Sequence, residues 1–453
     1  MRLIIIGGVA AGSKAAAKAR RQNPQLEIII YQDEAELSYS ACGMPYVIGG
    51  VIKNPRSLIV RTADEFAKDG IQVFTRHRVM QIDKIRKQLT VKNLQTDTEA
   101  TVSFDRLILA TGAKPIIPNV VGIDLQGVVT LRNYRDLQGL QTLLNSQQPK
   151  QAVIIGAGYI GLELAEAFQN RAIKTTLLEK SPQILPKFDA EIATLVHQYV
   201  VDKHVELIVG DGLVKLHGEQ GWVCAVESET GKRLAADLVV VAIGIRPNTA
   251  LAQDSGIALG TTGAIAVNAK METNAEGIFA AGDCCETVDR ITGKPIWMPL
   301  GDISALQGRV AGANAAGGDA HFSGVFGTAI FKTFALQVGC TGLSEKSARD
   351  CGFDPVSVLV TKADKARYYP DSQSLTLKLI ADKQNGRVLG AQALGFGGVD
   401  KMIDIVATAL LGKLSCADLE NADLAYSPPF SQVLSPVIVA AGALNKKIDT
   451  LCF

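Results

Sequence analysis

Two glycine-rich segments, each between an apolar strand and a helix, constrain the fold of this chain most strongly. The clearer one is GAGYIG at residues 156–161, which follows an apolar stretch at 152–155 and opens a helix that runs to Phe168. Its glycines suit a tight turn, the close approach of a pyrophosphate to the backbone, and the packing of helix on strand. The segment therefore predicts a dinucleotide-binding strand–helix–strand unit.

The strand that completes this unit, residues 174–178, ends in Glu179. An acid at that position accepts a hydrogen bond from the adenosine ribose 2′-hydroxyl and repels a 2′-phosphate, which favours NADH over NADPH. Lys180 beside it weakens that preference, so NADPH stays open as an alternative.

The other glycine-rich segment is GGVAAG at residues 7–12, between an apolar strand at 3–6 and a small-residue helix at 13–21. Val9 stands in place of the middle glycine, although Gly8 can supply the close approach to the backbone. One such motif is weak support for nucleotide binding. Two of them, each inside a strand–helix–strand unit, are strong support.

The ends of other apolar strands supply further candidate nucleotide contacts. These ends are Gln32-Asp33 after strand 26–31, Ala110-Thr111-Gly112 after 107–109, Gly244 after 239–243, and Gly282-Asp283 after 277–281. The first of them lacks the usual glutamate, so either Gln32 or Asp33 would contact the adenosine ribose.

The order of these features predicts one nucleotide-binding domain inserted in another. We expect an α/β chain with two Rossmann-like domains, the first at 1–112 and 248–322 and the second, inserted in it, at 113–247. Residues 323–453 contain no nucleotide motif. A strand at 375–380 and its partner at 387–393, joined across Asn385-Gly386, form a hairpin. An apolar-faced helix at 401–412 follows, and we expect an α+β domain whose role is dimerisation.

Composition excludes several classes of function. The 453 residues are 47% hydrophobic and 20% charged, with a net charge of +1, so neither nucleic acid nor a membrane surface is an expected partner. No apolar run is long enough to span a bilayer, and the N-terminus enters a strand at once, which predicts a cytoplasmic protein. The eight cysteines lack paired spacing and the five histidines are scattered, so no metal site is expected.

Cys42, in the run LSYSACGMPY at residues 37–46, is the leading candidate for a reactive side chain. The next cysteine is Cys224, so Cys42 would work alone, through a mixed disulfide, a persulfide or a sulfenic acid. Residues 43–48 read as a helix start, with Pro45 tolerated in the first turn. A sulfur at a helix N-terminus is favoured as the reactive thiolate. The alternative is a buried structural cysteine.

These features resemble the pyridine nucleotide-disulfide oxidoreductases over essentially the whole chain. They are most similar to the single-cysteine branch, which contains coenzyme A disulfide reductases, NADH oxidases and peroxidases, and NAD(P)H persulfide or polysulfide reductases. The most specific segments are residues 7–12, 38–50, 273–283 and 426–431. The resemblance implies that Cys42 is the redox nucleophile of a homodimeric FAD enzyme.

The resemblance also implies a division of labour between the two nucleotide folds. FAD would lie along the first, with its isoalloxazine near Cys42, in contact with Gly7, Gly8, Ala10, Ala11, Gly12, Gln32, Asp33, Ala110, Thr111, Gly112, Gly282 and Asp283. NADH, or NADPH, would dock on the second, in contact with Gly156, Gly158, Tyr159, Ile160, Gly161, Glu163, Glu179 and Gly244. Tyr159 would cover the nicotinamide side of the flavin and move aside. Glu163 would lie near the site of hydride transfer. Ordinary packing and surface charge are the alternatives for these two residues.

Within the branch, histidine placement and two tyrosines favour a disulfide or persulfide reductase. The first glycine-rich helix lacks the histidine that accompanies peroxide chemistry, and no histidine follows His321 to act as a C-terminal base. Tyr368 and Tyr426 stand where coenzyme A disulfide reductases place a catalytic pair contributed by the partner subunit. A tyrosine hydroxyl can protonate a departing thiolate. Packing at a dimer interface is the alternative, and Tyr369 is the rival of Tyr368.

Coenzyme A would need cations for its phosphates. Lys14, Lys18 and Arg21 share one face of the first helix, and Ser38, Arg61 and Lys68 are further candidate contacts. A solvated helix face is the alternative. Those enzymes often carry asparagine before the cysteine, where this chain has Ala41, which leaves the sulfur substrate open.

The sequence thus predicts an NAD(P)H-dependent reductase of coenzyme A disulfide or a related persulfide or polysulfide. The rivals are an NADH oxidase that reduces O₂ through a Cys42 sulfenate, and a non-enzymatic redox sensor. We expect Cys284 and Cys285 to fill space in the core, with Cys452 a weaker candidate for a second redox relay.

Overall fold

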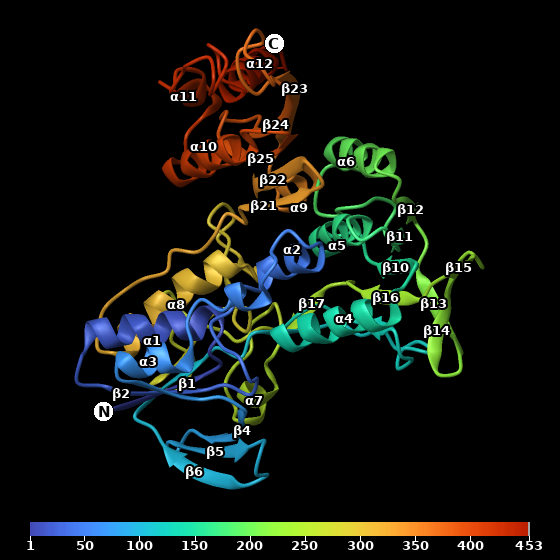
Figure 1. Cartoon of the computed structure of the whole chain (residues 1–453). Helices are drawn as coiled ribbons and strands as arrows, with labels where there is room; N and C mark the ends of the chain where they lie inside the picture. The colour runs from blue at the N-terminus through green and yellow to red at the C-terminus, as the bar shows by residue number, and fades with distance from the viewer. Residues whose placement is uncertain (452–453) are drawn as a thin grey trace. The chain divides into compact units, whose positions relative to one another are not determined.

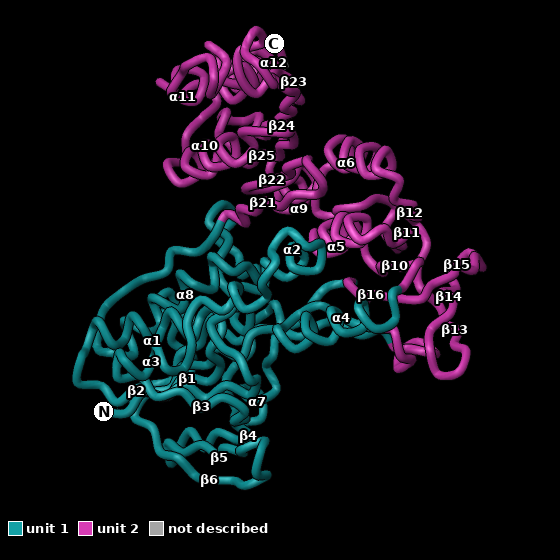
Figure 2. Tube along the Cα trace, in the orientation of Figure 1, with its two compact units in different colours: residues 1–118, 129–148, 243–325 teal, residues 119–128, 149–242, 326–453 magenta. Residues whose placement is uncertain are grey.

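The computed structural model describes residues 1–451 and divides the chain into two compact units (Figure 2). The first comprises residues 1–118, 129–148 and 243–325, and the second comprises 119–128, 149–242 and the chain from Phe326 onward. Each unit contains one of the two glycine-rich motifs. Across residues 1–451, no helix is both long enough and apolar enough to cross a bilayer.

A five-stranded parallel sheet forms the centre of the first unit, with the strand order β18-β7-β1-β2-β3. Its strands are β18 (Ile278–Ala280), β7 (Arg106–Leu109), β1 (Arg2–Ile6), β2 (Glu27–Tyr31) and β3 (Ile71–Phe74). The inner strands are apolar along most of their length because a parallel strand is covered on both faces.

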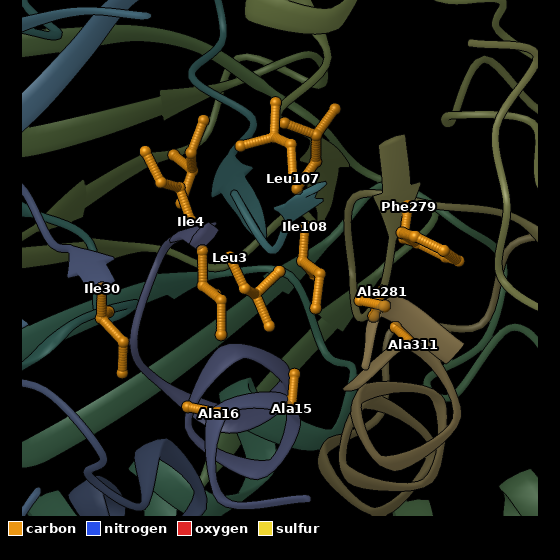
Figure 3. Close-up of a cluster of buried hydrophobic side chains, with 14 of the residues drawn as sticks. Leu3, Ile4, Ala15, Ala16, Ile30, Leu107, Ile108, Phe279, Ala281 and Ala311 are labelled. Carbon is orange, nitrogen blue, oxygen red and sulfur yellow. The ribbon is translucent and has the colours of Figure 1, made fainter. Parts of the chain in front are cut away.

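Helices α1 (Ala10–Gln22) and α8 (Gly301–Ala315) pack closely against each other beside this sheet (Figure 1). A Cβ atom on Gly308 or Gly312 would overlap the backbone of Ala11 or Ala15, so glycine is required at the crossing. Figure 3 shows how the alanines of the two helices lie near the isoleucines and leucines of β1 and β7.

The first unit contains further elements outside this sheet. They are α2 (Met44–Ile48), α3 (Ala63–Lys68), α4 (Tyr134–Gln147), α7 (Ala250–Asp254), an antiparallel sheet of β4 (His77–Asp83), β5 (Gln88–Asn93) and β6 (Glu99–Ser103), the pair β8 (Ala113–Pro115) and β17 (Ile245–Pro247), and the pair β19 (Thr287–Val288) and β20 (Pro295–Ile296).

The second unit combines the other nucleotide fold with the C-terminal region. Its first sheet has the order β12-β11-β10-β16-β9, and its core strands pair in parallel. The strands are β12 (Glu206–Val209), β11 (Lys174–Glu179), β10 (Gln151–Ile155), β16 (Leu238–Val241) and β9 (Val128–Val129), with helices α5 (Tyr159–Gln169) and α6 (Ala190–Asp202) and the antiparallel strands β13 (Leu213–Glu219), β14 (Trp222–Ser228) and β15 (Arg233–Ala235).

The C-terminal region is an antiparallel sheet with helices against it. The strand order is β21-β22-β25-β24-β23. These elements are β21 (Ala329–Thr333), β22 (Leu336–Gly342), β23 (Pro355–Ala363), β24 (Ser374–Asp382), β25 (Val388–Gly395), α9 (Glu345–Asp350), α10 (Val399–Gly412), α11 (Cys416–Glu420) and α12 (Pro436–Leu451). The predicted hairpin is confirmed, with Asn385-Gly386 in the turn between β24 and β25.

A buried lysine joins the nucleotide fold of the second unit to this antiparallel sheet. Lys378 on β24 is only 1% exposed, and its ammonium lies 3.2 Å from Asp189 Oδ2 and 3.0 Å from Glu191 Oε2 at the start of α6. Gln392 on β25 donates to Asp189 at 3.1 Å. Asp189 makes no side-chain cap on α6, so its carboxylate is directed to the sheet instead.

Candidate active site

Cys42 lies in an exposed turn of the first unit. It is the middle residue of a 3₁₀ turn, Ala41–Gly43, which leads directly into α2 with Pro45 in the first turn, as predicted. Its side chain is exposed. The buried structural role considered for Cys42 therefore does not describe this structure, whereas a reactive role requires the accessibility seen here.

The turn that carries Cys42 is tied to the first glycine-rich motif. The Ser38 amide donates to the Gly8 carbonyl at 2.8 Å, and the Ser40 amide donates to the Leu58 carbonyl at 2.8 Å. A Cβ atom on Gly43 would overlap Leu58 Cδ2, so a larger residue after the cysteine would require the Leu58 side chain to move. These contacts place the thiol in the same unit as the first nucleotide motif.

Gln32 holds the first glycine-rich segment in place. Its amide oxygen accepts a hydrogen bond from the Gly8 amide at 2.8 Å, and the side chain is 3% exposed. Gly7 has a φ of +96°, and a Cβ on Gly12 would overlap the Gly7 carbonyl, so the turn needs both glycines. Asp33 is exposed and lies 3.4 Å from Arg78 Nη2. Gln32 thus positions the glycine-rich loop, whereas the Asp33 side chain is exposed and paired with Arg78.

The candidate FAD contacts gather at one edge of the first sheet. Ala10 and Ala11 begin α1, while the predicted small residues follow β7 and β18, and the carboxyl ends of parallel strands share an edge. Thr111 is held by Asn248, whose side-chain amide donates to the Thr111 carbonyl at 2.8 Å. A Cβ on Gly282 would come 2.9 Å from that of Ala11. This cradle of small residues fits an extended dinucleotide such as FAD.

Arg132 adds a cation to this edge that no sequence motif indicated. Its guanidinium lies 2.6 Å from Asp283 Oδ2, and its Nε donates to the Ala113 carbonyl at 3.0 Å. The Ser304 hydroxyl donates to the other oxygen of Asp283 at 2.8 Å. Asp283, predicted to contact the cofactor, is therefore fixed by two partners from distant parts of the sequence.

Glu34 and Tyr39 form a second unpredicted pair, close in sequence to Cys42. The Tyr39 hydroxyl donates to Glu34 Oε2 at 2.8 Å, and the Tyr39 ring packs 5.8 Å from that of Tyr134. Burial raises the pKa of the Glu34 carboxyl to about 7. The carboxyl therefore exchanges its proton near neutral pH.

Replacing Glu34 with glutamine is expected to stabilise the protein at pH 8 more than at pH 5. Since folding raises the pKa of Glu34 from 4.5 to about 7, the folded state binds the extra proton, and stability falls as the pH rises through this range. Glutamine keeps the acceptor for Tyr39 and removes this penalty. In urea unfolding, the effect of the substitution on the free energy of unfolding should be more favourable at pH 8 than at pH 5 by about 2–3 kcal/mol.

The exposed Glu99 on β6 supplies the control, since Glu99→Gln should change stability equally at both pH values. If Glu34→Gln also changed the stability equally at both pH values, that result would contradict the raised pKa of the Glu34 carboxyl.

The second glycine-rich motif repeats the design of the first. Gly156 has a φ of +105°, and a Cβ on Gly161 would overlap the Gly156 carbonyl, whereas the space beside Gly158 is open. Glu179 accepts hydrogen bonds from the Ala157 amide at 2.8 Å and the Ser181 amide at 2.7 Å. The motif fits the pyrophosphate and ribose of NAD(P)H.

The other residues considered for NAD(P)H binding have different surroundings. Lys180 pairs with Glu229 at 2.8 Å, so its charge is partly engaged. Ile160 is exposed and Glu163 is half-buried on α5. Gly244 has a φ of +115° and accepts from the Ile116 amide at 3.0 Å. Tyr159 begins α5, with its ring packed against the C-terminal sheet.

The candidate cations for coenzyme A differ in availability. Lys14 and Arg21 are exposed on α1, and Lys18 donates to Gln22 at 3.2 Å. Arg61 is engaged within its own segment, since it pairs with Asp69 at 2.7 Å and covers the ring of Phe66. Two further positions complete the set: Lys68 is exposed, and Ser38 is buried with a left-handed backbone.

The two predicted tyrosines lie together in the second unit. Tyr368 and Tyr426 lie close together, and the interaction with Tyr368 raises the pKa of Tyr426. They line a groove of about 350 Å³ together with Arg367, Val433 and Leu434. The exposed fraction is 77% for Tyr368 and 45% for Tyr426. Two loops far apart in sequence are thus brought together at one surface.

Comparison with known protein families decides the assignment. Residues 1–316 match the model for the pyridine nucleotide-disulphide oxidoreductases, and residues 328–437 match the dimerisation domain of the same proteins. This chain belongs to the pyridine nucleotide-disulphide oxidoreductase family. The predicted fold class is confirmed, with two nucleotide-binding domains and a dimerisation domain.

Relatives within this family carry related names. An NADH oxidase of Methanocaldococcus jannaschii is 36% identical over 99% of this chain and 100% of its own length. An NAD(P)H coenzyme A polysulfide/persulfide reductase of Pyrococcus horikoshii is 35% identical over 98% of each chain. The solved structure of an NAD-dependent persulfide reductase from A. fulgidus has a TM-score of 0.97 at 38% identity, covering 100% of this chain and 84% of that one.

The family assignment settles the cofactors and the enzyme class. Pyridine nucleotide-disulphide oxidoreductases depend on FAD and NAD(P)H, and these are the cofactors of this oxidoreductase. Cys284 and Cys285 are buried in the core, as predicted, while Cys452 lies outside the described residues. Within residues 1–451, no group of three or more His, Cys, Asp or Glu side chains is placed to hold a metal ion.

Proposed function

We propose that this enzyme uses NAD(P)H to reduce a disulfide, persulfide or polysulfide of coenzyme A or another small thiol, through Cys42 alone. The exposed position of Cys42, on a turn hydrogen-bonded to the first glycine-rich motif, carries this proposal. Relatives named as coenzyme A polysulfide/persulfide and persulfide reductases support the substrate class.

The chemistry is a thiol–disulfide exchange with one protein sulfur. The Cys42 thiolate attacks a substrate sulfur, forms a mixed disulfide or persulfide, and expels the other half of the substrate as a thiol or a shortened polysulfide. FAD and NAD(P)H, when bound, supply the two electrons that cleave this new S–S bond. Cys42 returns to the thiolate, and the second thiol leaves after it gains a proton.

Tyr368 and Tyr426 are the proposed proton donors to the leaving sulfur. Both residues line the same exposed groove, so their hydroxyls lie at one surface. We propose that the protein is a homodimer and that each subunit presents this pair to Cys42 of its partner. The dimerisation domain supports a dimer, and the exposed apolar residues Phe430 and Val433 near the tyrosines suit an interface.

Residues on the two nucleotide motifs bind and orient the cofactors. We propose that Gly7 to Gly12, with the edge that ends in Asp283, hold FAD, and that Gly156 to Gly161 with Glu179 hold NADH in preference to NADPH. Exposed Lys14 and Arg21 would bind coenzyme A phosphates. Such thiol chemistry suits the reducing cytoplasm, the location expected from the sequence.

A second candidate function is oxygen reduction, because one relative is named an NADH oxidase. The two functions differ in their acceptor. NADH consumption by the FAD-loaded enzyme should therefore be followed with coenzyme A disulfide, with polysulfide and with O₂ alone. Release of thiol or sulfide in step with NADH supports the proposal, whereas rapid oxygen uptake without thiol release favours the oxidase.

A further inference from the structure

Helix α5 is fixed to the C-terminal sheet by strong polar contacts. Glu166 on this helix accepts hydrogen bonds from the Lys332 ammonium at 2.8 Å and from the Phe334 amide at 2.7 Å. The Thr333 hydroxyl donates to the Leu162 carbonyl at 3.2 Å. Charge-assisted bonds of this kind are the stronger class, so the body of α5 forms a rigid frame with strand β21.

The first residue of the same helix is held by weaker contacts. The ring of Tyr159 lies 4.8 Å from that of Phe331 on β21 and 6.3 Å, edge-on, from that of Phe188. Its hydroxyl lies 3.9 Å from the sulfur of Cys340 on β22. Burial raises the pKa of both groups, so both are neutral. A neutral thiol is a weak hydrogen-bond partner, so little is lost when the hydroxyl leaves it.

We infer that Cys340 is a positioning residue that acts as a latch. Its contact with the Tyr159 hydroxyl holds the ring where the nicotinamide binds, so an entering nicotinamide must displace the ring. The inference rests on the proposed function and on the role predicted for Tyr159 from the family resemblance, in which its ring covers the nicotinamide side of the flavin and moves aside. The contacts with Phe331 and Cys340 define the position of the ring in this structure. Since α5 itself is anchored through Glu166, only the side chain has to move. The weak latch then sets how readily the site opens.

This latch has a measurable consequence for binding. If a ligand must displace the ring, its apparent affinity is reduced by the fraction of molecules in which the ring has moved. NAD⁺ carries the nicotinamide and meets this cost. ADP-ribose shares the rest of the molecule but lacks the nicotinamide, so the latch leaves its affinity unchanged. The ratio of the two affinities therefore reports the latch separately from the integrity of the domain.

Calorimetric titration of the oxidised, FAD-loaded enzyme with NAD⁺ and with ADP-ribose tests the inference. We expect Cys340→Ala to tighten NAD⁺ binding by about two- to fivefold, the size of one weak hydrogen bond, with ADP-ribose binding unchanged. Tyr159→Phe removes the same contact from the other side. The double variant should therefore match the single ones rather than add to them. Cys224→Ala, on β14 of the same unit, is the control and should shift neither ligand.

The outcomes separate the latch from the proposed function. Unchanged or weaker NAD⁺ binding in Cys340→Ala, or an equal shift for both ligands, overturns the latch. Tyr159→Ala tests the gate itself, because it removes the ring. If Tyr159→Ala tightens NAD⁺ selectively and Cys340→Ala does not, only the role of Cys340 fails. If Tyr159→Ala leaves the ratio unchanged, the proposed gating role of Tyr159 fails as well, and the latch with it.

Discussion

Replacing Cys42 with serine is expected to lower the turnover of coenzyme A disulfide and of polysulfide by at least about 10³-fold, as the loss of a nucleophile does in other enzymes. A serine hydroxyl at neutral pH is a much poorer nucleophile toward sulfur than a thiolate. The measurement is NADH consumption with each acceptor, in parallel with the release of thiol or sulfide.

Two controls make this result specific to Cys42. The half-buried Cys351 follows α9 in the second unit, and Cys351→Ser should keep the parent activity. Reduction of the bound flavin by NADH should persist in Cys42→Ser, because the nucleotide motifs are untouched. Unimpaired turnover with both sulfur acceptors would remove Cys42 from the mechanism.

Replacing Lys378 with methionine is expected to destabilise the second unit by about 3–5 kcal/mol, the usual cost of removing one partner of a buried ion pair. Lys378 is 1% exposed, and the substitution would leave Asp189 buried without its cation. Methionine fills a similar volume, so the loss comes from the uncompensated carboxylate rather than from a cavity. Urea or thermal unfolding measures the effect.

The matched control is a lysine with an exposed partner. Lys346 pairs with Asp350 at 2.5 Å on the surface of α9, and Lys346→Met should cost less than about 1 kcal/mol because such pairs are screened by water. A loss as small for Lys378→Met would show that the carboxylates around it find other partners or protons. If the expected large loss is observed, the double variant Lys378→Met/Asp189→Asn should recover part of the lost stability, since it removes the unpaired buried charge.

Local patterns predicted the nucleotide folds well because their physics is local. Both glycine-rich turns were visible in the sequence, since only glycine tolerates the backbone angles of Gly7 and Gly156 and the close helix packing at Gly12 and Gly161. The helix boundaries were less exact. Helix α1 begins at Ala10, three positions before the predicted start at Ser13, because the glycine-rich turn itself passes directly into the helix.

The candidate site was predictable where a motif marked it and not elsewhere. Cys42, Tyr368 and Tyr426 were found from short runs, and the structure brings the two tyrosines together. Arg132, Glu34 and Cys340 carry no motif. Their roles depend on partners far away in the chain or on burial, as for Arg132 with Asp283 and Cys340 with Tyr159.

The sequence by itself determined the class of fold, the two nucleotide motifs and the single cysteine beside the first of them, because each depends on residue types within a short stretch. Only the tertiary structure decided which side chains become neighbours. It joined Lys378 to Asp189 and turned Gln32 inward to hold Gly8. It also raised the pKa of Glu34 through burial. Such contacts and desolvation follow from how distant segments pack, which no local pattern encodes.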